Sequence, residues 1–191
     1  MSAAGRSSVA ETMARIAPAA GAGRDQQSLS RLGPMLAFVT APVVLIDQLS
    51  KIYVRAHFGL NQTIPLIPGW LDVTYTRNPG AAFSLFATMP QWFRHGFFLG
   101  ISVAAIVVLI VLMARRTTPA RTAAAFALVL GGTIGNLIDR LSRGLVTDFI
   151  YFHHASFSYP VFNIADSAIT VGVAMILLFT WLDDRSAARV V

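Results

Sequence analysis

Three aspartates lie within the stretch from Gly131 to Gly172, in a chain that otherwise avoids acids. They are Asp139, Asp148 and Asp166, and the whole sequence contains only nine Asp and Glu residues. The segments on either side of them are strongly apolar. A carboxylate beside a lipid-facing helix is costly, so it persists where it is paired, hydrated or catalytic. We therefore expect the chemistry of this protein to lie here.

Asp148 and Asp166 are the best candidates for acid/base catalysis. Asp148 has apolar neighbours and no adjacent cation, and this setting should raise its pKa. Asp166 falls near the predicted start of a helix, where the helix dipole and the free N–H groups favour an ionised carboxylate. Two carboxylates whose settings favour opposite protonation states form an acid/base pair, and if they lie close together they share one proton. Such a pair can activate water for attack on an amide carbonyl.

The other charged residues of these segments also have structural interpretations. Asp47 and Lys51 are four residues apart, so they either form an ion pair across one helical turn or help to shape the site. Asp139 directly precedes Arg140, and we expect these two to form an ion pair that holds a helix end.

Asn163 and Asp166 have the spacing of a helix N-cap followed by an acid in the first turn, as in a capping box. Capping alone explains Asn163 well. It explains Asp166 less well, because a helix that begins in water needs only a Ser or Thr cap.

Other catalytic chemistries lack their sequence signatures. The chain has no HExxH motif, and the adjacent His153 and His154 lack the spacing of helical metal ligands, so we expect no metal site. Ser50 and Lys51 are neighbours, but neighbouring side chains on a helix point about 100° apart, which argues against a serine nucleophile with a lysine base. The chain contains no cysteine, which excludes thiol catalysis.

The composition predicts a membrane protein. Hydrophobic residues make up 55% of the 191 residues, charged residues only 13%, and the mean hydropathy is +0.62, whereas soluble domains are about 25% charged. The net charge of +6 raises the possibility of a nucleic-acid partner. The basic residues fall between apolar runs rather than along an aromatic-lined groove, so we expect positive-inside anchoring and no nucleic acid.

Four apolar segments predict four transmembrane helices, at about residues 32–53, 96–114, 123–141 and 161–182. About 20 helical residues cross a hydrocarbon core of roughly 30 Å. Arginines precede the first segment, lie between the second and third, and follow the fourth, so these regions should face the cytoplasm. We expect a disordered cytoplasmic tail over 1–30, one membrane-embedded domain over 31–182, and a second cytoplasmic tail over 183–191.

Two segments then remain on the outer side, at about residues 57–93 and 142–160. Alternation at Leu71, Val73 and Tyr75, with Gly, Pro and Asn nearby, predicts short strands on the membrane surface. This topology also brings the polar residues to one depth. They are Asp47 and Lys51 on the first span, Asn136, Asp139 and Arg140 on the third, Asn163 and Asp166 on the fourth, and Asp148 in the outer connection.

Five sequence blocks in this chain resemble the signature blocks of bacterial lipoprotein signal peptidase (signal peptidase II). They are DQLSK at 47–51, RNPGAAFSLF at 77–86, GGTIGNLIDRL at 131–141, VTDFIYFH at 146–153 and FNIADSAITVG at 162–172. They occur in the order of that family across about residues 35–182. Five blocks in register are far more specific than any single block.

The resemblance implies an aspartic endopeptidase of the bacterial inner membrane, with four transmembrane helices and a small periplasmic β-cradle. The implied substrate is a prolipoprotein that carries diacylglycerol on its lipobox cysteine, cleaved just before that cysteine. No metal or organic cofactor is implied, and we expect a monomer whose partners are this substrate and membrane lipid. A small transporter or proton relay that uses the same acids is the alternative.

The resemblance also assigns residues. The family's catalytic dyad matches Asp148 and Asp166. Its other functional polar positions match Asp47, Lys51, Asn78, Asn136, Asp139, Arg140 and Asn163. The chain departs from the family at Tyr151, where many relatives carry an acid, so the electrostatics near Asp148 should differ.

Overall fold

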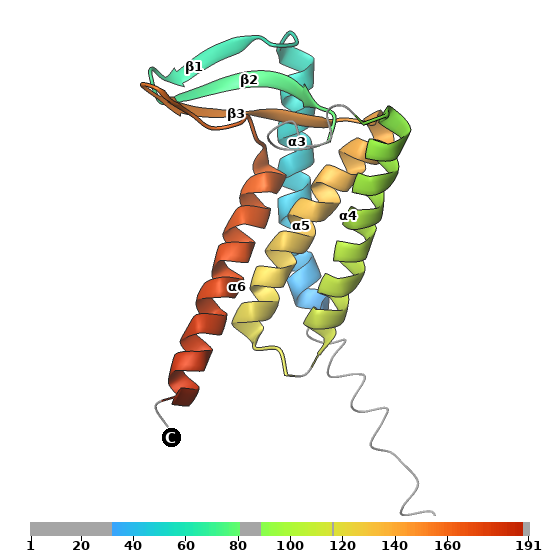
Figure 1. The fold of residues 1–191 in the computed structure, drawn as a ribbon, viewed down its shortest axis with the longest axis vertical. Helices are drawn as coiled ribbons and strands as arrows, with labels where there is room; N and C mark the ends of the chain where they lie inside the picture. Colours follow the sequence, from blue (N-terminus) through green and yellow to red (C-terminus); the bar gives the residue numbers. More distant parts are fainter. Residues whose placement is uncertain (1–31, 81–88, 116, 189–191) are drawn as a thin grey trace, which may run out of the picture.

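A computed structural model describes residues 32–80, 89–115 and 117–188 of the chain (Figure 1). The expected tail over 1–30 and part of the block at 77–86 lie outside the described residues. In chain order the elements are η1 (Leu36–Thr40), α3 (Ala41–His57), β1 (Thr63–Ile67), β2 (Leu71–Asn78), α4 (Gln91–Ala114), α5 (Ala120–Arg143), β3 (Val146–His154), β4 (Phe157–Ser158) and α6 (Ile164–Ala188).

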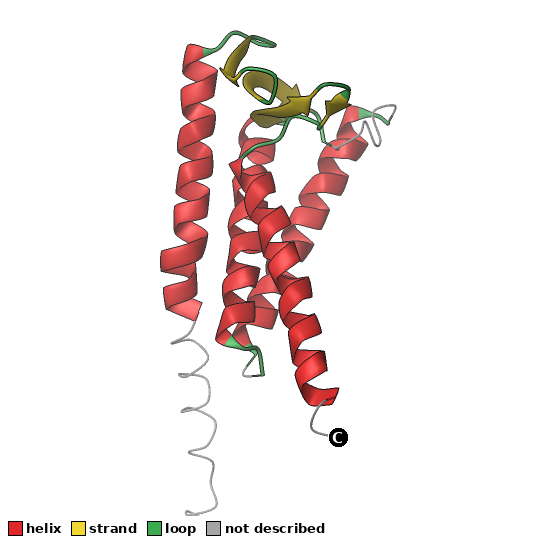
Figure 2. Cartoon of the chain, turned by 90° about the vertical axis from the view of Figure 1, so that its left-hand side faces the viewer, coloured by secondary structure: helices red, strands yellow, loops and turns green. Residues whose placement is uncertain are grey.

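Within the described residues, four helical segments are long and apolar enough to cross a membrane, and they are Leu32–His57, Gln91–Ala114, Ala120–Arg143 and Ile164–Ser186. A small antiparallel sheet lies across one end of these helices, and the C-terminal end of α6 lies at the other (Figures 1 and 2). The predicted fold class, a polytopic helical membrane protein with a small β-sheet, is therefore confirmed.

The first three helical segments extend beyond the apolar stretches that predicted them, whereas α6 begins at Ile164 instead of about residue 161 and continues past 182 to Ala188. Caps rather than apolarity set these helix ends. Pro90 precedes α4 and Pro119 precedes α5 as their N-cap residues. Proline suits such positions because its missing N–H has no partner at a helix start. At the other end of α5, Gly144 has φ 76° and its N–H donates to the carbonyl oxygen of Arg140. This left-handed cap favours glycine and turns the chain into β3.

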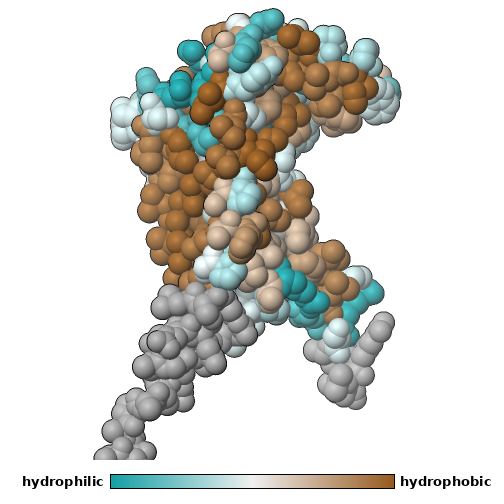
Figure 3. Space-filling model, turned by 180° about the vertical axis from the view of Figure 1, so that it is seen from behind, coloured by the Kyte–Doolittle hydropathy of each residue, from teal (hydrophilic) through white to brown (hydrophobic). Residues whose placement is uncertain are grey.

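Helix α5 lies at the centre of the helical part and packs against α3, α4 and α6 (Figure 1). It is the most buried of the four membrane-length helices. A side chain at Gly132 would collide with the backbone oxygen of Ala165 on α6, so glycine permits the close approach of the two helices. The outward faces are apolar instead of polar, as Figure 3 shows over most of the helical part, which suits contact with lipid.

The sheet has the strand order β1-β2-β3-β4, and all of its pairings are antiparallel. The predicted alternation at Leu71, Val73 and Tyr75 falls in β2, as expected for a strand. A cluster of Val54 on α3, Tyr75 on β2 and Phe149 on β3 attaches the sheet to the helices. This cluster holds β3 directly over the ends of α3 and α5, where the polar residues of the helices also lie.

The pairing of β2 with β3 is irregular beside Asp148. Val73 pairs with Ile150 and Thr76 pairs with Asp148, so two residues of β2 oppose one residue of β3 between these pairs. Such a bulge bends a strand and changes the direction of its side chains. Here the bulge lies in β2 opposite Phe149, directly beside the pair of Thr76 and Asp148.

Candidate active site

A cavity of about 630 Å³ lies where the sheet meets the ends of α5 and α6. Its lining includes both candidate carboxylates, Asp148 and Asp166, together with Asn78, Asn136 and Arg140. These residues come from β2, β3, α5 and α6. The convergence that the topology predicted from sequence is therefore found in the fold.

Asp148 is nearly inaccessible, with 2% of its surface exposed. Its Oδ2 accepts a hydrogen bond from Asn78 Nδ2 at 3.0 Å, and its Oδ1 accepts one from Asn163 Nδ2 at 2.6 Å. Burial, and then the nearby charge of Asp166, raise the pKa of the Asp148 carboxyl to about 7, while the two amide hydrogen bonds act in the opposite direction. The raised pKa that its apolar neighbours predicted is confirmed, and Asp148 can hold a proton near neutral pH.

Asp166 lies in the first turn of α6, and Asn163 directly precedes that helix. The Asp166 N–H donates to Asn163 Oδ1 at 2.9 Å, and the Asn163 N–H donates to Asp166 Oδ2 at 3.2 Å. The predicted capping box is therefore confirmed. A further bond from Asn136 Nδ2 to Asp166 Oδ1 at 2.8 Å leaves both carboxylate oxygens hydrogen-bonded.

Asn163 joins the two carboxylates. Its side-chain Nδ2 reaches Asp148 while its Oδ1 and backbone N–H bond to Asp166. The residue is fully buried. One residue therefore holds both carboxylates, Asp148 through its side-chain Nδ2 and Asp166 through its backbone N–H, and the bond to Asp148 was not revealed by the capping motif or its spacing in sequence.

The Asp47–Lys51 ion pair is present and fully buried, with Lys51 Nζ 2.9 Å from Asp47 Oδ2. Lys51 Nζ also donates to Asn136 Oδ1 at 3.0 Å. This bond sets which end of the Asn136 amide points toward Asp166. The other oxygen of Asp47 accepts the backbone N–H of Ala165 at 2.9 Å. The two residues therefore form an ion pair within α3 and also help to shape the site, so both predicted interpretations apply.

Gly135 permits this arrangement of α3 and α5. A Cβ at Gly135 would lie 2.6 Å from Asp47 Oδ2. Gln48 connects the two helices at this point. Its Nε2 donates to Asp47 Oδ2 at 3.0 Å and to the Gly135 carbonyl oxygen at 3.0 Å.

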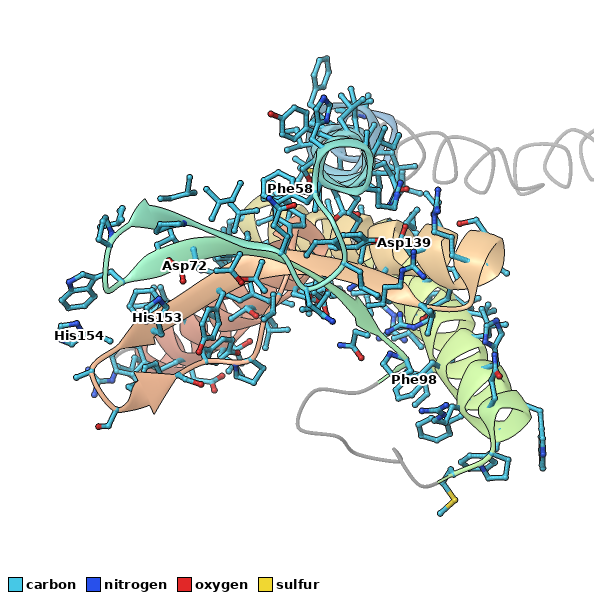
Figure 4. The ribbon with its side chains drawn as sticks, turned by 90° about the horizontal axis from the view of Figure 1, so that it is seen from above. Phe58, Asp72, Phe98, Asp139, His153 and His154 are labelled. Atoms are coloured by element: carbon cyan, nitrogen blue, oxygen red, sulfur yellow. The ribbon has the colours of Figure 1, made fainter. Side chains whose placement is uncertain are left out.

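The expected ion pair between Asp139 and Arg140 is wrong. Asp139 instead lies against α3, with Lys51 Nζ and Arg55 Nη1 each 3.5 Å from one of its oxygens. Arg140 points toward α4, and its guanidinium lies over the ring of Phe98. Figure 4 labels Asp139 over α5 and Phe98 apart from it, beside α4. Consecutive helical residues point about 100° apart, so neighbours in sequence need not be partners in space.

Arg140 also reaches the cavity, and one of its donors is unpaired among the residues that the structure describes. Its guanidinium lines the cavity beside the two carboxylates. Its Nε is buried, and in the described part of the chain it has no hydrogen-bond partner. The side chain carries a positive charge close to Asp148 and Asp166.

The two histidines of the sheet lie away from this cavity. His153 Nε2 is 2.9 Å from Asp72 Oδ2, and the ring of His154 stacks on Trp70. Figure 4 shows Asp72, His153 and His154 together near the outer end of the sheet, far from Asp139. Tyr151 stacks on His153 in this outer group. The described residues contain no group of three or more potential metal ligands.

Two residues at the site were missed from the sequence. Arg55 Nη1 donates to the hydroxyl of Thr147 at 3.1 Å, and the backbone N–H of Thr147 donates to Asp139 Oδ2 at 2.9 Å. Arg55 follows Lys51 by one helical turn, as Lys51 follows Asp47. This continued spacing of charged residues on one face of α3 was the available signal.

The charged residues that are buried among those the structure describes are Asp47, Lys51, Asp139 and Asp148. All of them lie at the end of the helices that meets the sheet. A transporter or proton relay needs polar groups along a path through the membrane. The described parts of the helices far from the sheet offer no buried charged residue for such a path.

Comparison with known proteins agrees with the geometry. Residues 39–182 match the family described as signal peptidase (SPase) II. The chain is 46% identical over 136 residues to a lipoprotein signal peptidase of Yersinia enterocolitica, covering 71% of this chain and 79% of that protein. It is 41% identical over 148 residues to a lipoprotein signal peptidase of Syntrophus aciditrophicus, covering 76% of this chain and 92% of the other.

A solved structure described as a bacterial membrane enzyme matches the fold, with a TM-score of 0.72 and 29% sequence identity over 81% of this chain and 91% of that one. These likenesses confirm the resemblance read from the five sequence blocks, and with it the expectation of an aspartic-type hydrolase. The chain is a bacterial membrane peptidase with a prolipoprotein substrate, and it belongs to the signal peptidase II family.

Proposed function

We propose that this protein is an intramembrane aspartic endopeptidase that removes the signal peptide from diacylglyceryl-modified prolipoproteins, cleaving just before the lipidated cysteine. Asp148 and Asp166 form its catalytic dyad. The observation that carries the proposal is that these two carboxylates line one cavity and both accept hydrogen bonds from Asn163, Asp148 from its side-chain Nδ2 and Asp166 from its backbone N–H. Paired acids of this kind activate water without a metal or a cofactor.

Asp148 is the member that holds the proton before reaction, since its pKa is raised to about 7. The ionised Asp166 accepts a proton from water as the water oxygen bonds to the carbonyl carbon of the scissile peptide. Asp148 gives its proton to the carbonyl oxygen, which forms a neutral gem-diol. One diol proton then returns to Asp148 and the proton on Asp166 passes to the amide nitrogen. The C–N bond breaks, and the products are a carboxylic acid and an amine.

The polar residues around the dyad have supporting roles in this proposal. Asn78, Asn136 and Asn163 orient the carboxylates through the bonds described above. Arg140 lines the cavity, and its Nε has no partner among the described residues, so it is suited to hold a carbonyl oxygen of the bound substrate.

A second cavity of about 420 Å³ supports a lipidated substrate. It is lined mainly by apolar side chains between the sheet and α6, and it shares four lining residues with the first cavity. The lining consists of Phe152, Tyr159, Phe162, Asp166, Ser167, Thr170 and Val171. An acyl chain seated here would extend from the dyad toward lipid, and each buried methylene group contributes about 0.8 kcal/mol.

The orientation in the inner membrane follows from the charges at the helix ends. Arg115, Arg121 and Arg185 lie at the ends of the helices remote from the sheet. The positive-inside rule places these ends, and both chain termini, in the cytoplasm. The sheet and the dyad then lie at the periplasmic face. A cysteine in place of Thr63 should react with a membrane-impermeant thiol reagent in intact cells, and protection from the reagent would reverse the orientation.

The function is tested by incubating the purified protein in detergent with a diacylated prolipoprotein and identifying the new N-terminus. We expect a single cut before the modified cysteine. Substitution Asp148→Asn or Asp166→Asn should abolish this cut. Cleavage at another bond, or cleavage that survives both substitutions, would refute the proposed reaction.

A further inference from the structure

Thr147 is held at three of its atoms by three different elements. Its N–H donates to Asp139 Oδ2 on α5 at 2.9 Å, and its carbonyl oxygen accepts from Asn163 Nδ2 at 3.3 Å. Its hydroxyl accepts from Arg55 Nη1 on α3 at 3.1 Å. Thr147 is buried, with 3% exposed. A residue whose only role is to continue a strand does not need three hydrogen bonds to groups outside the sheet.

The position of Thr147 matters because Asp148 follows it in β3. Successive side chains of a strand point to opposite faces. The Thr147 side chain points to Arg55 on α3, while Asp148 points into the cavity. A rotation or shift at Thr147 is therefore transmitted directly to the carboxyl group of Asp148.

The ladder pairs Thr147 with Arg77 and Asp148 with Thr76, but it is irregular directly beyond Asp148. The pairing of β2 with β3 is interrupted between Val73 and Thr76, next to the partner of Asp148. The extra residue of a bulge is unpaired, and the ladder is locally disrupted. The anchors on Thr147 lie beside this irregularity and add to the order that its pairing with Arg77 gives.

We propose that Arg55 is a positioning residue for the reaction, which acts through the Thr147 hydroxyl to orient the Asp148 carboxyl. The inference rests on the proposed role of Asp148. Arg55 does not line either cavity and does not contact the dyad. Its effect on the reaction is therefore indirect.

Arg55 makes two different contacts, so its positioning role can be tested apart from its ion pair with Asp139. Its Nη1 lies 3.5 Å from Asp139, a long distance for a hydrogen bond, and 3.1 Å from the Thr147 hydroxyl. Asp139 also has Lys51 and the Thr147 N–H as partners. Removing only the hydroxyl therefore leaves the charge cluster intact and breaks the contact on which the proposal depends.

Thr147→Val is the decisive variant, because valine matches threonine in shape and suits a strand. We expect kcat to fall about tenfold with KM within about twofold of wild type, the scale expected for a misplaced catalytic group. Arg55→Met should lower kcat similarly, and the double variant should be no slower than the slower single variant. Thr147→Ser keeps the hydroxyl and should retain nearly full activity.

The matched control is Arg121→Met. Arg121 also pairs with an aspartate, Asp183, but the pair is exposed and lies at the other end of the helices. This variant should keep the wild-type kcat. If Arg121→Met lowers kcat as much as Arg55→Met does, the effect of Arg55 is a general consequence of losing an arginine and the proposal is wrong.

The pH profile gives a readout that a loss of stability alone would not move. Asp148 interacts with the charges of Asp166 on α6, Lys51 on α3 and Arg140 on α5. If its carboxyl is released toward water in Thr147→Val, its pKa falls below about 7. The alkaline limb of kcat should then move to lower pH.

Wild-type kcat and an unchanged alkaline limb in Thr147→Val would overturn the proposal. So would losses that multiply in the double variant, since Arg55 and Thr147 would then act independently. Both outcomes are distinct from failure of the proposed function, which would appear as cleavage by Asp148→Asn.

Discussion

Asn163 Nδ2 lies 2.6 Å from Asp148 Oδ1, although Asn163 is also the residue that caps α6. One residue thus begins a helix and holds a carboxylate on a neighbouring strand. Because the cap uses the side-chain oxygen and the bond to Asp148 uses the nitrogen, the two roles can be separated by mutation.

Asn163→Ser should separate them. Serine caps helices about as well as asparagine, so we expect a melting temperature within a few degrees of wild type, on the scale of about 1 kcal/mol. The lost donor to Asp148 should lower the cleavage rate by about tenfold or more. The measurement is the initial rate per folded enzyme, with Asn163→Ala as the variant that loses both roles. Full activity in Asn163→Ser would show that the bond to Asp148 is dispensable.

The buried Asp47–Lys51 pair should be more sensitive to single than to paired substitution. Lys51→Met leaves the Asp47 carboxylate without its ion partner, and Asp47→Asn leaves Lys51 with only the more distant Asp139. Breaking a buried pair from one side costs about 3–5 kcal/mol. The double variant Asp47→Asn/Lys51→Met removes both charges and keeps an oxygen for the Ala165 N–H.

We therefore expect the double variant to melt at a higher temperature than Lys51→Met alone. Its activity should nevertheless stay below wild type, since the Asn136 amide loses the donor that orients it toward Asp166. A double variant that is destabilised by the sum of the two single effects would show that the charges do not interact.

The pH dependence of cleavage follows from the protonation state of Asp148. The proposed mechanism needs this carboxyl protonated, and its pKa is about 7. A carboxyl loses its proton as the pH rises through its pKa, so kcat should fall above about pH 7, approaching tenfold per pH unit. The profile should be recorded at saturating substrate with the enzyme shown to be monodisperse at each pH. A rate that keeps rising between about pH 7 and pH 9 would mean that Asp148 acts in its ionised form.

The lipid of the substrate should contribute to binding, while metal ions should not affect the rate. An unlipidated precursor lacks the acyl chains that suit the apolar cavity beside Asp166, so its kcat/KM should be at least about a hundredfold lower. A chelator should leave cleavage of the lipidated precursor unchanged. Equal cleavage of both precursors would remove the proposed role of that cavity, and activity lost to a chelator but restored by zinc would contradict a purely aspartic mechanism.

The sequence alone predicted the membrane-length helices and the end of these helices at which the site lies. Long uncharged runs identify helices in lipid, and the order of those helices brings Asp47, Asp139 and Asp166 to the same end. The capping box was also predictable, because Asn163 and Asp166 are close in sequence and their bond is local. The strand at Leu71–Asn78 followed from alternation.

The partners of individual charges were not predictable in the same way. Asp139 forms an ion pair with Arg55, 84 positions away in the chain, instead of pairing with its neighbour Arg140. The bond from the Ala165 N–H to Asp47 spans 118 positions. Such contacts depend on the rotation of one helix against another, which the packing at Gly132 and Gly135 decides. Apolar patterning predicts which face of a helix is buried. It does not predict which buried polar groups form hydrogen bonds or ion pairs with each other.

The identity of the dyad is tested most directly by comparing Asp139→Asn, Asp148→Asn and Asp166→Asn in one assay. The measurement is the initial rate of cleavage of a diacylated prolipoprotein per folded enzyme, with folding judged by monodispersity and melting temperature. Asp148→Asn and Asp166→Asn should fold and lose nearly all cleavage, because each loses an ionisable group that faces the cavity. Asp139→Asn should melt at a lower temperature, since Asp139 holds Lys51, Arg55 and Thr147, but the folded molecules should still turn over. A folded, inactive Asp139→Asn beside an active Asp148→Asn would contradict the assignment and place the dyad at Asp139 and Asp166.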